Sequence, residues 1–217
     1  MPESQKHGFI WQNDMMANVY KVPEAVIASE KYTAAHDVPA AHNGLDHVDL
    51  SIKTTGNAKR VDMGDALRIF DTVSSGAPFH MTVIHWVQDG EKKRLVSITE
   101  VDLTNSKEAL FGTLTKEEII ALDTAVKAFP KGCSAKDPSC APITALCESL
   151  CAKSGAIQLN KKIDSKSQRR LQCSFNNFTG FLAAHPERIM ASSKTGAFRG
   201  GAIQECIDSS CRVRAKN

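Results

Sequence analysis

The chain has 217 residues, of which 42% are hydrophobic and 24% are charged, and this balance is enough to bury one sizeable core. No apolar run approaches the roughly 18 to 20 residues that a membrane span needs, and the first residues, MPESQKHGF, lack the apolar segment of a signal peptide. We therefore expect one domain over residues 1–217, in an intracellular protein that is not secreted and has no membrane partner.

The charge is distributed unevenly along the chain. The net charge is only +3, but residues 153–217 hold 12 Lys or Arg against 4 Asp or Glu, whereas residues 1–152 hold 15 against 20. This asymmetry favours contact of the C-terminal part with a polyanion, although a solvated basic surface has the same composition. The seven cysteines are an odd number and indicate reduced thiols, not a disulfide framework.

The first third of the chain is expected to form a helix, a loop, a strand and a second helix. Apolar residues near helical spacing predict a helix over residues 8–31 that breaks at a proline. Residues 32–46 contain Pro, Gly, His and Asp, which predicts a loop or short strand before a strand over HVDLSIKTTG, residues 47–56. Gly64-Asp65 then opens GDALRIF, whose apolar positions suit a helix packed on this strand.

The remaining elements alternate between strands and helices. FHMTVIHWV and RLVSITEVDL flank QDGEKK, whose Asp-Gly pair predicts a β-hairpin. TKEEIIALDTAVKAF begins with a capping box of Thr115 and Glu118, and PITALCESLCAKSG has Pro142 near its first turn, so both segments are expected to be helices. Two strands around KKIDSKSQRR and a helix near residues 178–185 complete a mixed α/β fold, in which helices flank a central mixed sheet.

The predicted strand over HVDLSIKTTG has a polar face of a particular chemistry. Successive strand side chains point to opposite faces, so Asp49, Ser51 and Lys53 share one face, and Asp37 lies just upstream in HDVP. Hydrolysis of a phosphodiester needs carboxylates that hold Mg²⁺ and a cation that orients water or stabilises the growing charge. These residues therefore predict a catalytic group, although D-x-S-x-K strands also occur on solvated sheet edges.

Four blocks of sequence, HGFIWQND, VDLSIKTTG, MGDALRIF and SKSQRRLQCS, resemble in this order the site-specific DNA endonucleases of large DNA viruses and some bacteria. The resemblance implies a restriction-endonuclease fold with a PD-(D/E)xK active site, and a location in the cytoplasm or nucleus of a host cell or in a virion. Lys53 would be the motif lysine, Ser51 would occupy the usual acidic position, and Asp37 or Asp49 would be the leading metal-binding acid. Serine cannot bind a metal as a carboxylate does, so Asp49, or Glu100 on a neighbouring strand, must compensate.

Glu100, in VSITEVDL, is the third candidate acid. It shares strand parity with Val96 and Ile98, so it points to the apolar side, where an ionised carboxylate is costly unless it is paired or metal-bound. The alternative is a strand-end residue that turns to solvent. Asp37, Asp49 and Glu100 are therefore the predicted ligands of Mg²⁺.

The segment KSQRRLQCS is the predicted DNA-reading strand. Arginine neutralises phosphates and reads guanine, and glutamine reads adenine. Arg170 and Gln172 share strand parity, whereas Arg169 and Leu171 point the other way. A surface strand with its charges in water is the alternative. The predicted DNA-contacting residues are Arg68, Lys166, Arg169, Arg170, Gln172, Lys194 and Arg199.

Four cysteines, at 133, 140, 147 and 151, are separated by six, six and three residues. Structural zinc sites usually use tighter C-x2-4-C pairs. Cys147 and Cys151, at i and i+4, equally fit two small apolar residues on one helix face, so the spacing leaves both interpretations open.

The principal hypothesis is a Mg²⁺-dependent, sequence-specific endonuclease of double-stranded DNA, similar to type II restriction enzymes. Residues 1–217 would form the nuclease domain, with residues 153–217 as its basic, DNA-contacting part, and Lys53 would position or activate the attacking water. A homodimer is expected because a two-fold protein matches a palindromic site. The alternatives are a non-catalytic DNA-binding protein in which Ser51 marks a decayed active site, and a DNA-packaging protein of a virion.

Overall fold

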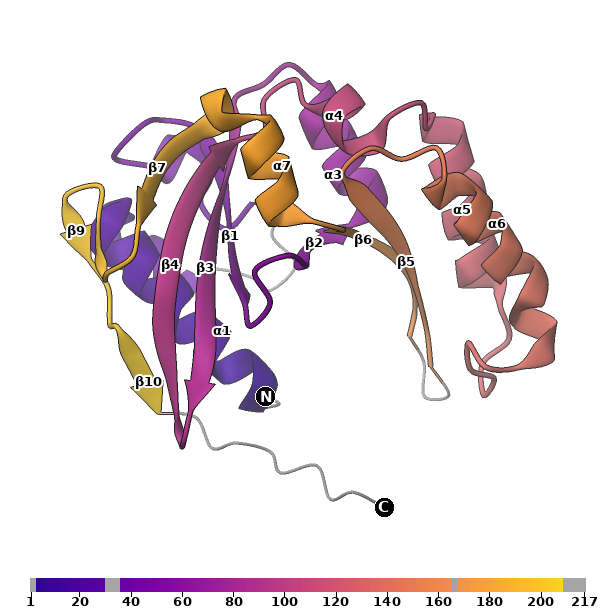
Figure 1. The fold of residues 1–217 in the computed structure, drawn as a ribbon, viewed down its shortest axis with the longest axis horizontal. Helices are drawn as coiled ribbons and strands as arrows, with labels where there is room; N and C mark the ends of the chain where they lie inside the picture. Colours follow the sequence, from indigo (N-terminus) through magenta and orange to yellow (C-terminus); the bar gives the residue numbers. More distant parts are fainter. Residues whose placement is uncertain (1–2, 30–35, 165–167, 209–217) are drawn as a thin grey trace. The chain divides into compact units, whose positions relative to one another are not determined.

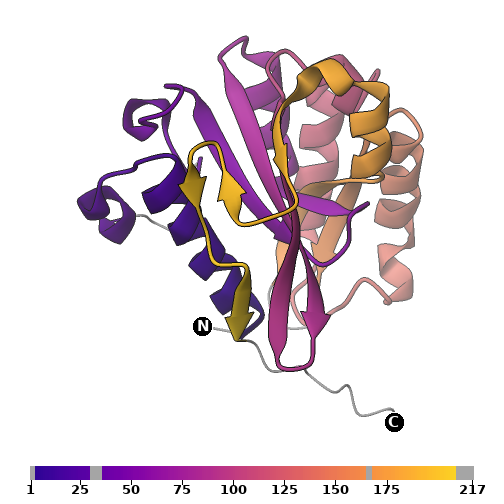
Figure 2. The same cartoon turned by 60° about the vertical axis from the view of Figure 1, so that its left-hand side comes forward.

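The computed structural model describes residues 3–29, 36–164 and 168–208 of the chain. The chain divides into two compact units, and in each unit helices lie beside a β-sheet (Figures 1 and 2). The predicted mixed α/β class is therefore confirmed. The first unit combines Met1–Ala58, Pro78–Leu103 and His185–Asn217, and the second combines Lys59–Ala77 and Thr104–Ala184.

The main sheet of the first unit is mixed, because it contains parallel and antiparallel strand pairs. Its strands are β1 Asp49–Thr55, β3 Phe79–Asp89, β4 Lys92–Asp102, β7 Ile189–Ser193 and β10 Cys206–Asp208. β1 runs parallel to β3, and β3 and β4 form the antiparallel hairpin predicted from the Asp-Gly pair. β10 and β7 both pair with β4, at different points along its length. A separate small hairpin joins β8 Ala197–Phe198 to β9 Gly201–Ala202.

A helix at the start of the chain covers one face of this sheet. α1 Glu3–Asp14 continues into a π-helical turn, η1 Met15–Val19, which ends with Tyr20 N–H donating to Met15 O over 3.0 Å. α2 Glu24–Ser29 follows after a break at Pro23, as predicted. The short 3-10 turns of this unit are η2 Ala40–His42 and η4 Pro186–Arg188.

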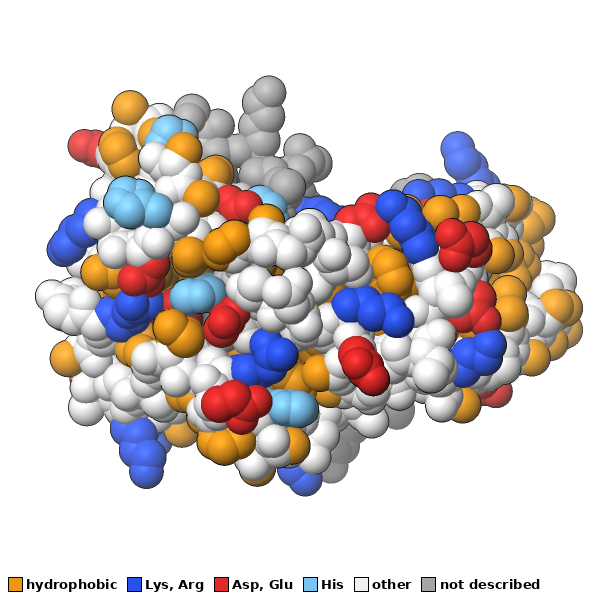
Figure 3. All heavy atoms as spheres, turned by 90° about the horizontal axis from the view of Figure 1, so that it is seen from above, with side chains coloured by type: hydrophobic (Ala, Val, Ile, Leu, Met, Phe, Trp, Pro, Cys, Tyr) orange, Lys and Arg blue, Asp and Glu red, His pale blue; other side chains and the backbone are white. Residues whose placement is uncertain are grey.

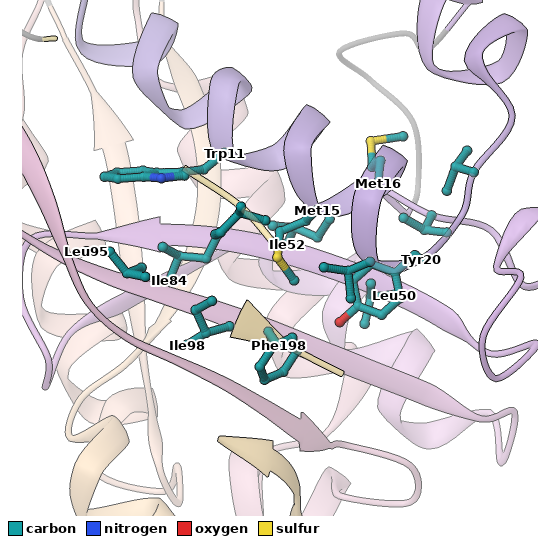
Figure 4. Packing of buried hydrophobic residues seen from close by; sticks show 14 of the residues in the cluster. Trp11, Met15, Met16, Tyr20, Leu50, Ile52, Ile84, Leu95, Ile98 and Phe198 are labelled. Carbon is teal, nitrogen blue, oxygen red and sulfur yellow. The ribbon is translucent and has the colours of Figure 1, made fainter. Parts of the chain in front are cut away.

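The hydrophobic core of the first unit lies between this helix and the sheet, and it also includes the β8–β9 hairpin (Figure 4). It joins side chains of the helix to alternate residues of the strands because every second strand residue points to the same side. The residues of this cluster labelled in Figure 4 are Trp11, Met15, Met16, Tyr20, Leu50, Ile52, Ile84, Leu95, Ile98 and Phe198. The strand residues that point into this core therefore form the apolar face that packs on the helix.

β1 has the two chemically different faces that its sequence predicts. Leu50 and Ile52 are buried in the core, whereas Ser51 and Lys53 point to the opposite side. Val38 forms an antiparallel bridge to Leu50, with N–H to O=C distances of 3.0 and 2.8 Å. This bridge holds the segment upstream of β1 against the free edge of the strand, next to its polar face.

The second unit has an antiparallel sheet in the order β2-β6-β5, and its apolar face packs on α3, α5 and α6. Its strands are β2 Val61–Asp65, β5 Ile157–Ile163 and β6 Arg169–Phe175. Its helices are α3 Ala66–Ser74, α4 Lys107–Phe111, α5 Lys116–Ala128, η3 Pro138–Cys140, α6 Ala141–Cys151 and α7 Phe178–Ala184. In the part of the chain that the structure describes, every helix is too short or too polar to cross a membrane.

The helix starts in the second unit are set by local sequence signals. Asp65 caps α3 by accepting the Arg68 N–H over 2.9 Å. Thr115 and Glu118 form the predicted capping box of α5, and Pro142 stands in the first turn of α6. The capping box of α5 and the place of Pro142 in α6 were predicted from the sequence, and both predictions are confirmed.

Arg169, one of the predicted DNA-contacting residues, is bound within the protein. All five of its N–H donors reach main-chain carbonyls: Nε donates to Phe129 over 2.9 Å, and Nη2 donates to Pro130 and Cys133. Nη1 donates to the carbonyls of Asp164 and Gln168 over 2.8 and 2.7 Å. The side chain ties the start of β6 to the segment that follows α5, and its donors are all used within the protein.

We predict that Arg169→Ala lowers the free energy of unfolding by about 2 kcal/mol, because several carbonyls lose a charged donor. Urea unfolding followed by circular dichroism measures the change. Arg170→Ala is the matched control, because Arg170 is exposed on the other face of the same strand, and it should change stability by less than about 0.5 kcal/mol. Equal losses in the two variants would contradict this role for Arg169.

Candidate functional site

The structure brings together three of the predicted catalytic residues at the edge of β1. Asp37 Oδ2 accepts hydrogen bonds from Ser51 Oγ over 2.9 Å, from the Ile52 N–H over 2.5 Å and from Lys53 Nζ over 3.2 Å. The bridge between Val38 and Leu50 explains this contact, because it turns Asp37 and Ser51 toward the same side. All three donors bind Oδ2, and none of the three binds Oδ1.

Asp49 lies at the start of the same strand and has different partners. Its Oδ1 accepts the Ala40 N–H over 2.8 Å, and its Oδ2 lies 3.6 Å from His36 Nε2. The His36 ring in turn contacts the Phe79 ring, with centroids 5.6 Å apart. Asp49 therefore shares the strand face of Ser51 but is held by the segment that precedes β1.

Glu100, the third predicted metal ligand, lies on the opposite face of the sheet. The strand registers pair Ile52 with Thr82 and Thr82 with Glu100, which puts these three side chains on the buried side. Lys53, one residue along β1, points the other way. The expectation that Glu100 points to the apolar side is met, and this same orientation separates it from Asp37.

Glu100 is the centre of a buried polar network. It has no exposed surface, and each of its oxygens receives hydrogen bonds. Tyr20 OH donates to Oε2 over 2.8 Å and lies 2.6 Å from Thr82 Oγ1. His80 Nδ1 lies 2.8 Å from Oε1, and Arg199 Nη1 donates to the same oxygen over 2.6 Å. The carboxylate thus joins the end of η1, two neighbouring strands and the β8–β9 turn.

Arg199 extends this network to a second carboxylate. Its Nη2 donates to Asp46 Oδ1 over 2.8 Å, and its Nη1 lies 2.6 Å from Asp46 Oδ2. The buried Asn43 shapes the loop that carries Asp46, because its Oδ1 accepts the Leu45 and Asp46 N–H groups over 3.1 and 3.3 Å. One guanidinium therefore bridges the Asp46 and Glu100 carboxylates.

The tight turn between β8 and β9 aims Arg199 at Glu100. Phe198 pairs with Gly201, which leaves Arg199 and Gly200 as a two-residue hairpin loop. Both loop residues have positive φ, 46° and 81°, as a type I′ turn requires. This conformation is uncommon for arginine, and the two ion pairs of its side chain offset part of the cost.

The network sets the charge states of its members. Burial alone would raise the pKa of Glu100, but hydrogen bonds from His80, Arg199 and Tyr20 outweigh it and hold this pKa below its ordinary value of 4.5. Burial and the adjacent carboxylate raise the pKa of Tyr20. At neutral pH, Glu100 is therefore an anion and the Tyr20 hydroxyl keeps its proton as a donor.

Asp46, His80 and Glu100 form a group that could hold a metal ion, because one ligand atom of each lies within 4.8 Å of the others. Of these three residues, only Glu100 was predicted from the sequence as a metal ligand. Parity in FHMTVI does put His80 on the side of Thr82 and Ile84, but Asp46 stands in a loop without a spacing signal. No three-ligand group within the described ranges contains a cysteine, and Cys147 and Cys151 each contact the Leu159 carbonyl at 3.6 Å.

The other predicted DNA-contacting residues are spread over both units. Arg170 and Gln172 lie on the polar face of the β2-β6-β5 sheet, with Arg170 exposed and Gln172 half-buried. Arg68 is half-buried in the first turn of α3. Lys194 is exposed in the turn that follows β7. Lys166 lies outside the described residues.

The fold and its sites define a mixed α/β protein with a mixed sheet and a buried acidic and histidine cluster. Comparison of the chain with protein-family models, with curated proteins and with solved structures finds no match. A half-buried Asp37–Lys53 pair and a buried Glu100 network lie on opposite faces of the main sheet.

We predict that Glu100→Gln lowers the free energy of unfolding by about 3 kcal/mol at pH 7, because it removes the charge that Arg199 neutralises in a buried site. Since the pKa of Glu100 is depressed in the folded state, its contribution is present above pH 4.5 and is lost as the pH falls below that value. The difference in Tm between wild type and variant should therefore shrink between pH 5 and pH 3.

Differential scanning calorimetry across this pH range gives the measurement. Glu91→Gln is the control, because Glu91 is exposed at the β3–β4 turn. A Tm difference for Glu100→Gln that stayed constant down to pH 3 would show that the ionised carboxylate is not the stabilising form.

Proposed function

We propose that the protein is a Mg²⁺-dependent endonuclease of double-stranded DNA, with Asp37, Asp49 and Lys53 in its active site. The observation that carries the proposal is the contact between Lys53 Nζ and Asp37 Oδ2 at 3.2 Å, on the polar face of an edge strand. A carboxylate beside a lysine on adjoining extended segments is the pairing that metal-assisted phosphodiester hydrolysis requires. The likeness of four sequence blocks to restriction-endonuclease-like enzymes points to the same reaction.

Accessibility favours this group over the Glu100 network as the place of reaction. The side chains of Lys53 and Asp37 are 22% and 21% exposed, and that of Asp49 is 30% exposed, whereas Glu100 has no exposed surface. A phosphodiester in a duplex can approach only groups that reach the surface. The chemistry is therefore assigned to the Asp37 side of the sheet.

The donor set of the site fits Mg²⁺, which prefers carboxylate and water oxygens. Asp37, through the oxygen that its three donors do not use, and Asp49 would hold the ion. When bound, Mg²⁺ supplies charge stabilisation to the phosphate that is attacked. Lys53 holds the attacking water and stabilises charge on the phosphate, while the Ser51 hydroxyl keeps the Asp37 carboxylate in position.

The duplex-binding role is assigned to the polar face of the β2-β6-β5 sheet. Gln158, Asn160 and Lys162 on β5 lie beside Arg170 and Gln172 on β6, and these residues offer donors to phosphates and base edges. On the face of the molecule seen in Figure 3, acidic and basic side chains alternate and form no large patch of one sign. A homodimer, which pairs two active sites with a palindrome, belongs to the same proposal.

One observation favours a second function, DNA binding without catalysis. Ser51, at the position where the related enzymes carry an acid, is buried and donates its hydroxyl to Asp37. A serine in this state adds no negative charge for a metal. Incubation of a long mixed-sequence DNA with the protein and Mg²⁺ separates the two functions, because discrete fragments appear only if the protein cleaves.

We predict that Lys53→Ala and Asp37→Asn each lower the cleavage rate at least 100-fold and change duplex affinity less than threefold, because both groups act on the reaction more than on binding. Cleavage and binding are measured on one duplex. Lys92→Ala, an exposed lysine of the β3–β4 hairpin, is the matched control and should keep full activity. Near-normal cleavage by Lys53→Ala would remove this lysine from the active site.

We predict that Arg170→Ala and Gln172→Ala reduce preference for the cognate duplex by about 1 to 3 kcal/mol for each base that the side chain no longer binds. Cognate and mismatched duplexes are compared at two salt concentrations, because removal of a phosphate-binding group changes the salt slope instead. The control is Lys136→Ala, because Lys136 is exposed in the loop between α5 and η3. If both substitutions left the preference unchanged, the reading surface would lie elsewhere.

A further inference from the structure

The guanidinium of Arg199 lies between the two carboxylates of the candidate metal group. Arg199 Nη1 is 2.6 Å from Glu100 Oε1 and 2.6 Å from Asp46 Oδ2. His80 Nδ1 lies 2.8 Å from the same Oε1. One positively charged nitrogen thus stands beside the atoms that would coordinate a cation.

The spacing of these atoms suits a divalent metal. A metal with bond lengths of about 2.1 Å holds neighbouring ligand atoms roughly 3 Å apart. The 2.8 Å between His80 Nδ1 and Glu100 Oε1 is close to this separation. A small contraction of the two 2.6 Å contacts would bring the carboxylate oxygens to bonding distance of an ion placed near Arg199 Nη1.

We propose that Asp46, His80 and Glu100 form a binding site for a first-row divalent metal such as Mn²⁺ or Zn²⁺, and that Arg199 is a tethered cation that occupies this site until the metal displaces it. The site lies on the opposite face of the sheet from Asp37 and Lys53. It therefore goes beyond the proposed nuclease activity and does not depend on it.

The donor set selects the class of metal. An imidazole nitrogen with two carboxylates suits Mn²⁺, Fe²⁺ or Zn²⁺ better than Mg²⁺, which prefers oxygen ligands. Tyr20 donates to Glu100 Oε2, so this hydrogen bond fixes the carboxylate while Oε1 faces the metal position. Thr82 in turn contacts the Tyr20 hydroxyl at 2.6 Å. The outer partners of a metal site are thus present.

Exchange of arginine for metal keeps the site close to charge balance. The buried carboxylate of Glu100 and the half-buried carboxylate of Asp46 need a cation, and either the guanidinium or the ion supplies positive charge. His80 can bind a metal through Nδ1 only if that nitrogen carries no proton. The proton of the neutral ring then lies on Nε2, which is 4.0 Å from Asp102 Oδ1. The Arg199 side chain is 18% exposed at the tip of a two-residue turn, which gives it a path to solvent.

The test measures Mn²⁺ binding through the EPR signal of the free ion, which disappears on binding. All proteins carry Asp37→Asn, so that the proposed Mg²⁺ site does not contribute. We expect Arg199→Gln to bind Mn²⁺ at least tenfold more tightly than the parent, because the competing cation is gone. Arg94→Gln, which removes an exposed arginine of β4, is the matched control and should bind as the parent does.

Two further variants make each outcome decisive. Adding His80→Ala to Arg199→Gln should abolish the gained affinity, and Mn²⁺ should raise the Tm of Arg199→Gln but not that of the double variant. If Arg199→Gln does not fold, Arg199→Lys serves, because a lysine lacks the planar fork that bridges both carboxylates and should still give tighter Mn²⁺ binding than arginine.

Binding by Arg199→Gln, or in its place Arg199→Lys, that matched the parent would overturn the proposal. So would a gain in affinity that survived the loss of His80. Neither measurement involves DNA cleavage, so failure of this site and failure of the nuclease proposal are distinguishable.

Discussion

A carboxylate with no exposed surface must receive enough hydrogen bonds and positive charge to replace the water that it has lost, and Glu100 is such a group near the C-terminal end of β4. Its partners come from four places: Tyr20 at the end of η1, His80 on β3, Arg199 in the β8–β9 turn and, through Arg199, Asp46 in a loop. These segments are far apart in the sequence, so satisfying one buried charge fixes the arrangement of most of the first unit. The π-helical turn and the positive φ of Arg199 are locally unfavourable backbone conformations, and the contacts of this arrangement stabilise them.

The same sheet separates two kinds of chemistry. The face that packs on α1 and η1 holds Glu100 in a network whose members are all paired, which suits stability or a closed metal site. Its other face carries Lys53 and Asp37, which are paired to each other but reach solvent. Groups that act on a macromolecule must be accessible, whereas groups that only hold charge in the interior need not be. Strand alternation alone produces this division, because Ile52 and Lys53 are neighbours in sequence and point to opposite sides.

Strand parity also decides the different roles of two adjacent arginines in the second unit. Arg169 lies on the parity of the buried Leu171 and Cys173, and its guanidinium turns to the carbonyls of the loop after α5. Arg170 lies on the polar face and stays exposed. Strand alternation predicted that the two arginines lie on opposite faces, and the structure confirms this. The carbonyls of Phe129, Pro130 and Cys133, which bind Arg169, are more than 30 residues away in the chain and gave no signal in the local sequence. Only the folded chain brings these acceptors to Arg169.

Local sequence by itself determined much of the fold, namely the mixed α/β class, the β3–β4 hairpin, the capping of α3 and α5, and the two faces of β1. These features depend on neighbours within a few residues, where turn, capping and alternation rules apply. Asp37 and Lys53 were named as candidate members of one active site, and the Val38–Leu50 bridge brings their side chains into contact. The Glu100 network was beyond sequence reasoning for a definite reason. A register shift between His85 and Trp86 changes the pairing of β3 with β4, and regular pairing from the turn onward would set Thr82 opposite Thr99 instead of Glu100. Whether His80 and Glu100 share a face is therefore decided by one irregularity in the strand pairing, which only the tertiary structure fixes.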